Sequence, residues 1–147
     1  MTKLFVGTEL AKVIELNHPD SIADHSDAAA IIHPGQIHEV LAFLKQAEDL
    51  DFQVLCALTA VDYIEYFEVI YHLLSMRRNT RCVIKARLPG REELTIPSVT
   101  DLWRGAELQE REIWDLMGIK FEDHPNMKRI LLWEGFPGHP LRKDFIR

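Results

Sequence analysis

Hydrophobic and polar residues alternate along two neighbouring stretches in the middle of the chain, residues 66–74 and 81–88. A period of two places successive side chains on opposite faces of a β-strand, so each stretch predicts a strand with one buried face. Residues 52–61 are apolar at both alternate sets of positions, which is typical of a central strand covered on both sides. Short polar links at 62–65 and 77–80 predict that the three strands form an antiparallel meander. The positions expected to face the core are Phe67, Val69, Tyr71, Leu73, Cys82, Ile84, Ala86 and Leu88.

The residues before the meander predict two helices and a short strand. Residues 36–49 carry an apolar stripe with helical spacing, from Ile37 to Ala47. Near the N-terminus, Thr8 is a candidate N-cap for a helix that ends before His18-Pro19. Residues 28–33 form a short apolar run, which predicts a buried strand.

A third helix is expected after the meander. Ser98, followed three residues later by Asp101, resembles a capping box, and Gly118 is a candidate C-cap. The apolar stripe between them consists of Leu102, Ala106, Gln109, Ile113, Leu116 and Met117.

Residues 123–147 have no helical or strand periodicity, and prolines and glycines cluster around residues 135–140. The sequence therefore predicts a small α+β domain over residues 1–122, with helices packed on the meander, and an extended C-terminal arm over 123–147. The two parts differ in charge: 12 basic and 20 acidic side chains give −8 for 1–122, whereas 5 basic and 3 acidic give +2 for 123–147. This difference indicates that the C-terminal arm contacts something other than its own acidic body.

Composition excludes several functions. The net charge of −6 and the absence of a basic block argue against nucleic-acid binding. The N-terminal residues carry one lysine and no apolar core of a signal peptide, so we expect a cytosolic protein. Cys56 and Cys82 do not form a C-x-x-C pair and cannot supply the four ligands of an iron–sulfur cluster; we expect two buried core thiols.

The richest cluster of charges is the run from Glu110 to Asp115. On a helix, Arg111 and Asp115 are one turn apart and can pair, and Glu112 shares a face with Asp115. Two neighbouring carboxylates can carry out acid–base chemistry, but with Arg111 available we favour an ion-pair network that holds the helix in place. Metal binding is disfavoured because the candidate ligands lack the usual spacing. Those candidates are Asp115, Asp123, His124, His139 and Asp144.

The C-terminal arm carries aromatic and basic residues without a periodic face that would bury them. Trp133, Phe136, Leu141 and Phe145 should therefore pack on a larger surface, as interface anchors do. From composition alone, that surface is as easily the arm's own domain as a partner protein.

Together these motifs resemble the signature of the 30-kilodalton subunit of NADH–quinone oxidoreductase, the enzyme known as respiratory complex I. This family has relatives in membrane-bound hydrogenases. The matching residues are Glu110-Arg111-Glu112, Asp115-Leu116, Gly118-Ile119, Phe121, His124-Pro125, Arg129-Ile130-Leu131 and Gly138-His139-Pro140-Leu141-Arg142-Lys143-Asp144-Phe145.

The resemblance implies a non-catalytic subunit of the complex's peripheral arm, on the cytoplasmic side of the membrane. It implies no cofactor in this chain: NADH, FMN, iron–sulfur clusters and quinone belong to other subunits. It also implies that the C-terminal arm lies along the quinone-site subunit, of the 49-kilodalton type, or along the large subunit in a hydrogenase-type complex. A free-standing hydrolase using Glu112, Asp115 and His139 is the alternative from a different class. The expected interface residues are Glu110, Arg111, Glu112, Asp115, Arg129, Trp133, Phe136, His139, Leu141, Arg142, Lys143, Asp144 and Phe145.

Overall fold

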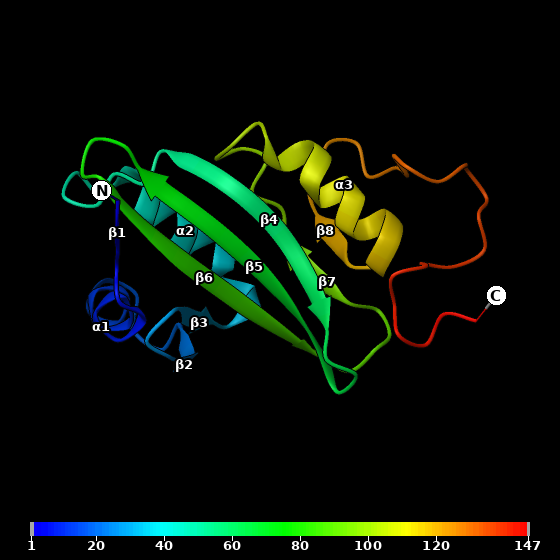
Figure 1. Ribbon diagram of the computed structural model, residues 1–147, viewed down its shortest axis with the longest axis horizontal. Helices are drawn as coiled ribbons and strands as arrows, with labels where there is room; N and C mark the ends of the chain where they lie inside the picture. The colour runs from blue at the N-terminus through cyan, green and yellow to red at the C-terminus, as the bar shows by residue number, and fades with distance from the viewer. Residues whose placement is uncertain (1, 147) are drawn as a thin grey trace.

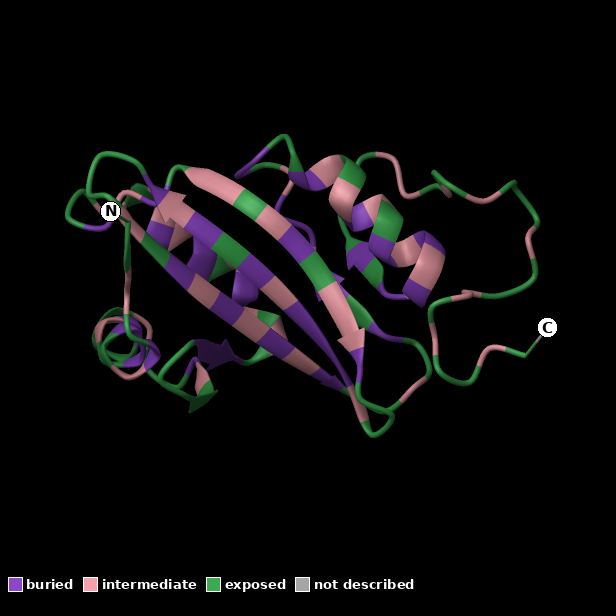
Figure 2. Ribbon diagram, viewed as in Figure 1, coloured by how far each residue is buried: buried purple, intermediate pink, exposed green. Residues whose placement is uncertain are grey.

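The computed structural model describes residues 2–146 and has a mixed six-stranded β-sheet as its central layer (Figure 1). Its larger half is the predicted meander, in which β4 (Val54–Asp62), β5 (Tyr66–Ser75) and β6 (Thr80–Pro89) pair antiparallel. All eight residues predicted to face the core from β5 and β6 are buried (Figure 2). The α+β fold class and the meander are therefore confirmed.

The other half of the sheet lies beyond β6. There β3 (Ala30–Ile32) runs parallel to β6, and β2 (Ile22–His25) pairs antiparallel with β3. β1 (Lys3–Leu4) also pairs parallel with β6, at the first two residues of that strand, whereas β3 pairs with its middle. The predicted strand at 28–33 corresponds to β3, whereas alternation could not reveal β1 and β2 because they are so short.

Two helices cover the inner face of the sheet and enclose the core. α2 (Ile37–Gln46) follows a short 3-10 helix (Pro34–Gln36) and lies behind the strands in Figure 1, with one apolar face fully buried. It ends before the predicted residue 49, because the chain turns at once and Asp51 adopts a positive φ of 52°. None of the helices in residues 2–146 has the length and hydrophobicity of a membrane span.

α1 (Gly7–Asn17) ends before His18 as expected, but its predicted start was wrong. Val6 is the N-cap and Thr8 lies inside the helix. The helix begins earlier because Gly7 fits tightly against the loop before β3, where a Cβ would lie 2.0 Å from the Ser26 carbonyl oxygen. Only glycine allows that approach.

The prediction that residues 52–61 form a central strand was wrong, since β4 lies at the edge of the sheet. One edge of β4 pairs with β5, and the other edge is flanked by α3 (Ala106–Met117) instead of by another strand. There the Leu58 N–H donates to Gln109 Oε1 over 2.6 Å. A helix beside the strand thus explains its high apolar content. Cys56 is exposed, so its prediction as a core thiol was also wrong, whereas Cys82 is buried and burial raises the pKa of its thiol.

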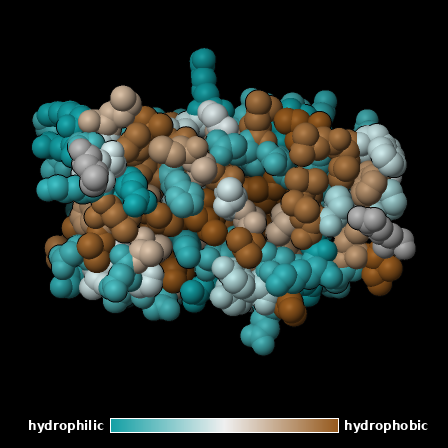
Figure 3. Space-filling model, in the orientation of Figure 1, coloured by the Kyte–Doolittle hydropathy of each residue, from teal (hydrophilic) through white to brown (hydrophobic). Residues whose placement is uncertain are grey.

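α3 is flanked by a second, two-stranded sheet, in which β7 (Thr95–Pro97) and β8 (Lys120–Glu122) run parallel. The outer face of the main sheet, towards the viewer, is left uncovered by the helices of residues 2–146 and carries mixed hydrophobic and hydrophilic side chains (Figure 3). After β8, residues 123–146 contain no helix or strand and extend past the end of α3 (Figure 1).

Candidate functional site

Three charged residues of α3, Glu110, Arg111 and Asp115, act as clamps: each binds backbone groups of a segment that has no regular secondary structure. Glu110 is fully buried; its Oε1 accepts a hydrogen bond from Ser98 Oγ at 2.6 Å, and its Oε2 accepts from the Val99 N–H at 2.8 Å. Burial raises the pKa of Glu110 to about 7, although these two hydrogen bonds oppose the shift. The predicted capping box was therefore wrong: α3 begins at Ala106, and Ser98 binds Glu110 rather than the first turn of the helix.

Asp115 holds the first part of the C-terminal arm. Its Oδ2 accepts hydrogen bonds from three consecutive backbone N–H groups, those of residues 130, 131 and 132, at 3.2, 2.7 and 3.0 Å. Arg129 Nη1 donates to Asp115 Oδ1 at 2.9 Å. Burial alone would raise the pKa of Asp115, but Arg129 and the three N–H groups outweigh it and hold the pKa below its ordinary value.

Arg111, one helical turn before Asp115 on α3, binds the residues of the arm that directly precede those bound by Asp115. It donates to the carbonyl oxygens of Lys128 at 3.1 Å and Arg129 at 2.9 Å. The predicted pairing of Arg111 with Asp115 was wrong, because Arg129 takes the place beside Asp115. A carboxylate that binds N–H groups and a guanidinium that binds carbonyls together satisfy a backbone that has no secondary structure of its own.

The second part of the C-terminal arm is held by an ion cluster at the end of β4. Asp62, which is 3% exposed, pairs through both carboxylate oxygens with Arg91 at 2.7 and 2.8 Å. Asp62 Oδ2 also accepts the Lys143 N–H at 2.8 Å, and Arg91 Nε donates to Asp144 at 3.1 Å. Arg142 donates to the Arg91 carbonyl oxygen, which closes the cluster. Hydrogen bonding to Arg91 holds the pKa of Asp62 well below its ordinary value.

Between these two attachments the arm packs against the end of α3. The His139 ring lies 5.0 Å from the Trp114 ring, and its Nδ1 donates to the Asp115 carbonyl oxygen at 3.0 Å. Gly118, the predicted C-cap, adopts a φ of +80°, and a Cβ there would lie 2.8 Å from His139. This position therefore needs glycine for its backbone conformation and for the fit of the arm.

The arm buries only some of its aromatic residues. Phe136 and Phe145 are half-buried and stack on each other with ring centroids 6.1 Å apart. By contrast, Trp133 is 68% exposed, Leu131 63% and Leu141 60%. Ile146 is 88% exposed and Ile130 37%. The arm thus folds back on its own domain while presenting several large apolar side chains to solvent.

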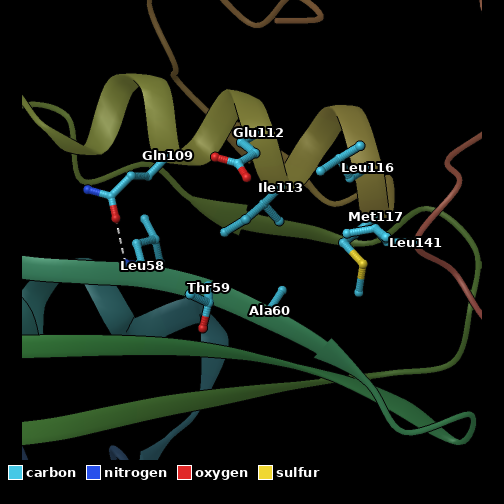
Figure 4. A pocket seen from close by; sticks show the side chains of 9 residues that line it. All are labelled: Leu58, Thr59, Ala60, Gln109, Glu112, Ile113, Leu116, Met117 and Leu141. Atoms are coloured by element: carbon cyan, nitrogen blue, oxygen red, sulfur yellow. Dashed lines mark hydrogen bonds between the residues drawn. The ribbon is translucent and has the colours of Figure 1, made fainter. Parts of the chain in front are cut away.

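Glu112 does not join the other carboxylates. It is exposed, whereas Asp115 is fully buried, so the expected shared face was wrong. Glu112 lines an apolar groove of about 360 Å³ between α3 and β4 (Figure 4). The other lining residues are Leu58, Thr59, Ala60, Gln109, Ile113, Leu116, Met117 and Leu141.

The residues of the hydrolase alternative are engaged elsewhere: Asp115 and His139 hold the arm, and Glu112 lies on the groove. Within residues 2–146, His, Cys, Asp and Glu side chains do not gather into a group of three able to bind a metal ion. The sequence reasoning missed Asp62 and Arg91, because their partners are distant in sequence and no short motif marks them. It did single out Ser98, but as a helix cap and not as a partner of Glu110.

Several residues of the sequence signature hold the arm or its neighbouring segments, among them Glu110, Arg111, Asp115 and Arg129. Comparison with known proteins assigns the chain to the family that the signature resembles. The family model for the respiratory-chain NADH dehydrogenase 30-kilodalton subunit matches residues 30–147. The chain belongs to this family. The C 2 subunit of NADH-quinone oxidoreductase from Rhizobium meliloti (strain 1021) is 44% identical over 126 residues, which cover 84% of this chain and 68% of the relative. The chain thus spans about two thirds of that relative's length.

Two further similarities concern assemblies. The C/D subunit of NADH-quinone oxidoreductase from Sulfurihydrogenibium sp. (strain YO3AOP1) is 43% identical over 111 residues, which cover 73% of this chain and 19% of the relative. Among solved structures, the membrane-bound sulfane sulfur reductase, an archaeal respiratory membrane complex, contains a chain with a TM-score of 0.73 and 26% identity. The match covers 95% of this chain and 85% of that one. Family members thus occur in multisubunit respiratory complexes, and the present chain is a complex I–type subunit.

Proposed function

We propose that this chain is a non-catalytic structural subunit in the peripheral arm of an NADH:quinone oxidoreductase, on the cytoplasmic side of the membrane. In this proposal, NADH, FMN, iron–sulfur clusters and quinone are bound by other subunits. The proposal is supported by the engagement of the charged signature residues of α3, since Glu110, Arg111 and Asp115 all bind backbone groups of this same chain.

The C-terminal arm is the proposed docking element, and its partner is the quinone-site subunit. The supporting observation is that the arm is firmly attached to its own domain, yet leaves large apolar side chains exposed to solvent. Two buried carboxylates, Asp115 and Asp62, fix its course, yet Leu131, Trp133 and Leu141 remain largely exposed. A segment that is ordered before binding loses little conformational entropy when it docks, and large exposed apolar side chains gain most from being buried.

The choice of partner is supported by the Sulfurihydrogenibium relative, whose name joins the letters C and D in a single chain. Subunits that are encoded as one polypeptide remain close to each other. In the resemblance described above, the D subunit is the 49-kilodalton, quinone-site subunit, so that subunit is the simplest neighbour for this chain. The Arg142 and Asp144 side chains and the Lys143 backbone N–H already bind this chain's own residues, so they set the position of the arm more than they add to affinity.

A second candidate is the equivalent subunit of a membrane-bound complex with another electron donor, of which hydrogenases are one kind. The observation in its favour is the 0.73 TM-score with the sulfane sulfur reductase chain. The two candidates are distinguished by purifying the complex from the native cells through a tag on this chain. NADH-dependent quinone reduction by the purified complex supports the first candidate, and activity only with another donor supports the second. A chain that purifies alone, from cells with an assembled respiratory complex, contradicts both.

The docking role is tested by exchanging exposed apolar residues of the arm. We expect the double variant Leu131→Ser, Trp133→Ser to fold normally but to lose most of its co-purification with the quinone-site subunit. The matched control is Leu16→Ser on α1, which is 83% exposed and lies on a different element. Equal recovery of the partner with the double variant and the control would show that the folded body, and not the arm, forms the interface.

A further inference from the structure

The carboxyl group of Glu110 is buried beside neutral hydrogen-bond donors. It is 0% exposed, and within residues 2–146 its hydrogen-bond donors are Ser98 Oγ and the Val99 N–H. Arg111, next to it on α3, is turned towards the carbonyls of Lys128 and Arg129. A buried carboxylate without a cation is costly, so such a group holds a proton more tightly than one in water.

His124 lies close to Glu110, with Nε2 at 3.9 Å from Glu110 Oε1, but its hydrogen bonds define a neutral ring. Nδ1 accepts the Asn126 N–H at 2.9 Å and therefore carries no proton, while Nε2 donates to the Glu107 carbonyl oxygen at 3.0 Å. The contact with Glu110 is accordingly not an ion pair.

Two further groups interact electrostatically with Glu110, and Asp101 is the one that disfavours its negative charge. Tyr71, from β5, is fully buried, and burial together with the electrostatic effect of Glu110 raises the pKa of its hydroxyl. Asp101, from the segment before α3, raises the pKa of Glu110 further by repulsion, and its own carboxylate pairs with His38 at 2.8 Å. The balance of these groups places the pKa of Glu110 at about 7.

A chain of hydroxyl groups joins this buried carboxyl to the surface. Glu110 Oε1 lies 2.6 Å from Ser98 Oγ, which lies 3.0 Å from Thr100 Oγ1. Ser98 and Thr100 both line a polar surface groove of about 500 Å³, together with His38 and Asp101. A hydroxyl both donates and accepts, so the two side chains can reverse their hydrogen bonds in concert.

We propose that Glu110 is a proton-binding site that exchanges its proton with solvent through Ser98 and Thr100. In the protonated state the Glu110 Oε1–H donates to Ser98 Oγ, and the Ser98 hydroxyl donates to Thr100 Oγ1. On release, the Glu110 proton passes to Ser98, the Ser98 hydroxyl proton passes to Thr100, and the Thr100 hydroxyl proton passes to water. The carboxylate left behind accepts from the Ser98 hydroxyl and from the Val99 N–H. Each hydroxyl that gives up a proton receives another, so the net change is one proton lost from Glu110 and one gained by water.

The site lies on the helix that holds the C-terminal arm, but the proposal does not depend on where the arm docks. It predicts a definite pH dependence of folding. The pKa of Glu110 is raised in the folded chain, so the carboxyl contributes stability that is fully present below its ordinary pKa of 4.5. That contribution is lost as pH rises from 4.5 to about 7, by a factor of up to about ten in the unfolding equilibrium constant per pH unit.

The first test is a titration of the full-length wild-type chain, with the Glu110 side-chain carboxyl carbon assigned by NMR. We expect its chemical shift to titrate with a midpoint near neutral pH, and the pH dependence of unfolding described above to be absent from Glu110→Gln. A midpoint at the ordinary value for glutamate, about 4.5, would overturn the proton site. The wild-type titration requires no variant, so the test stands even if Glu110→Gln fails to fold.

The relay is tested separately by the rate of proton release after a rapid rise in pH, followed by infrared absorption of the carboxylic acid. We expect Thr100→Val, which replaces the hydroxyl by a methyl group of similar size, to slow release about tenfold or more while shifting the midpoint little. The matched control is Thr59→Val on β4, where the side chain is exposed and far from the relay in sequence. Equal release rates in wild type, Thr100→Val and the control would overturn the relay.

Discussion

The clearest test of the clamp on α3 is the substitution Asp115→Asn, which removes one negative charge and leaves one acceptor oxygen. In the native chain the carboxylate accepts three backbone N–H groups and one Arg129 N–H, and it is 0% exposed. Asparagine cannot accept all four, and its amide would point a donor at one of them. Hydrogen bonds to a buried charge are each worth roughly 1.5–3 kcal/mol, and breaking a buried pair costs about 3–5 kcal/mol.

We therefore expect the first part of the C-terminal arm to lose about 3 kcal/mol of local stability, which corresponds to an increase in local opening on the order of 100-fold. The direct assay is amide hydrogen exchange at residues 130, 131 and 132, whose N–H groups point at Asp115. The loss should be larger for these amides than for the sheet, because the body keeps its core when the arm detaches.

Glu112→Gln is the matched control, because it removes the same charge from an exposed position of the same helix. We expect unchanged protection of the three amides in this variant. A double-mutant cycle with Arg129→Ala should show strong non-additivity, since both side chains belong to one network. Unchanged amide protection in Asp115→Asn would refute the reasoning that this carboxylate orders the arm.

Three further outcomes are expected. Ile84→Asp places a charge at a 0% exposed core position and should destabilise the domain by several kcal/mol, enough to prevent cooperative thermal unfolding; an unchanged melting temperature would mean that the inner face of β6 is misassigned. The pKa of Asp62 is depressed by Arg91, so this carboxyl contributes stability that is present above its ordinary pKa of 3.8 and lost as pH falls below it; an acid titration of Asp62→Asn should lack that loss. Gly118→Ala must strain a φ of +80° and displace His139, so it should cost about 1–2 kcal/mol in chemical denaturation, and a neutral result would count against the close fit.

Much of the fold could be predicted because periodicity directly reports which side chains are buried. The alternation in β5 and β6 correctly identified the inner face, and the apolar stripe of α2 identified its packing face. The edge position of β4 could not be predicted in this way. An edge strand that is covered by a helix can be as apolar as a central strand that lies between two others. Only the order of the strands in the sheet distinguishes the two cases.

The candidate site was only partly predictable for a related reason. The motif from Glu110 to Asp115 identified the important helix, but the partners of those side chains lie 11 to 18 residues away, in segments without regular structure. Helical spacing favoured pairing of Arg111 with Asp115, whereas the arm supplies Arg129, which binds the carboxylate and the carbonyl of Asp115 together. Short-range spacing does not reveal such tertiary competition. The β7–β8 sheet escaped prediction because each strand has three residues, too few for a period.

The most direct test of the docking role is a photo-crosslinking measurement in the assembled complex. A photoreactive phenylalanine analogue is placed at position 133, where the native side chain is 68% exposed, and in a separate chain at position 16, where the native side chain is 83% exposed. After irradiation, mass spectrometry identifies the crosslinked protein. We expect position 133 to crosslink to the quinone-site subunit, and position 16 to give no crosslink to that subunit. An assembled complex in which position 133 forms no crosslink to the quinone-site subunit, while position 16 does, would contradict the docking role of the arm.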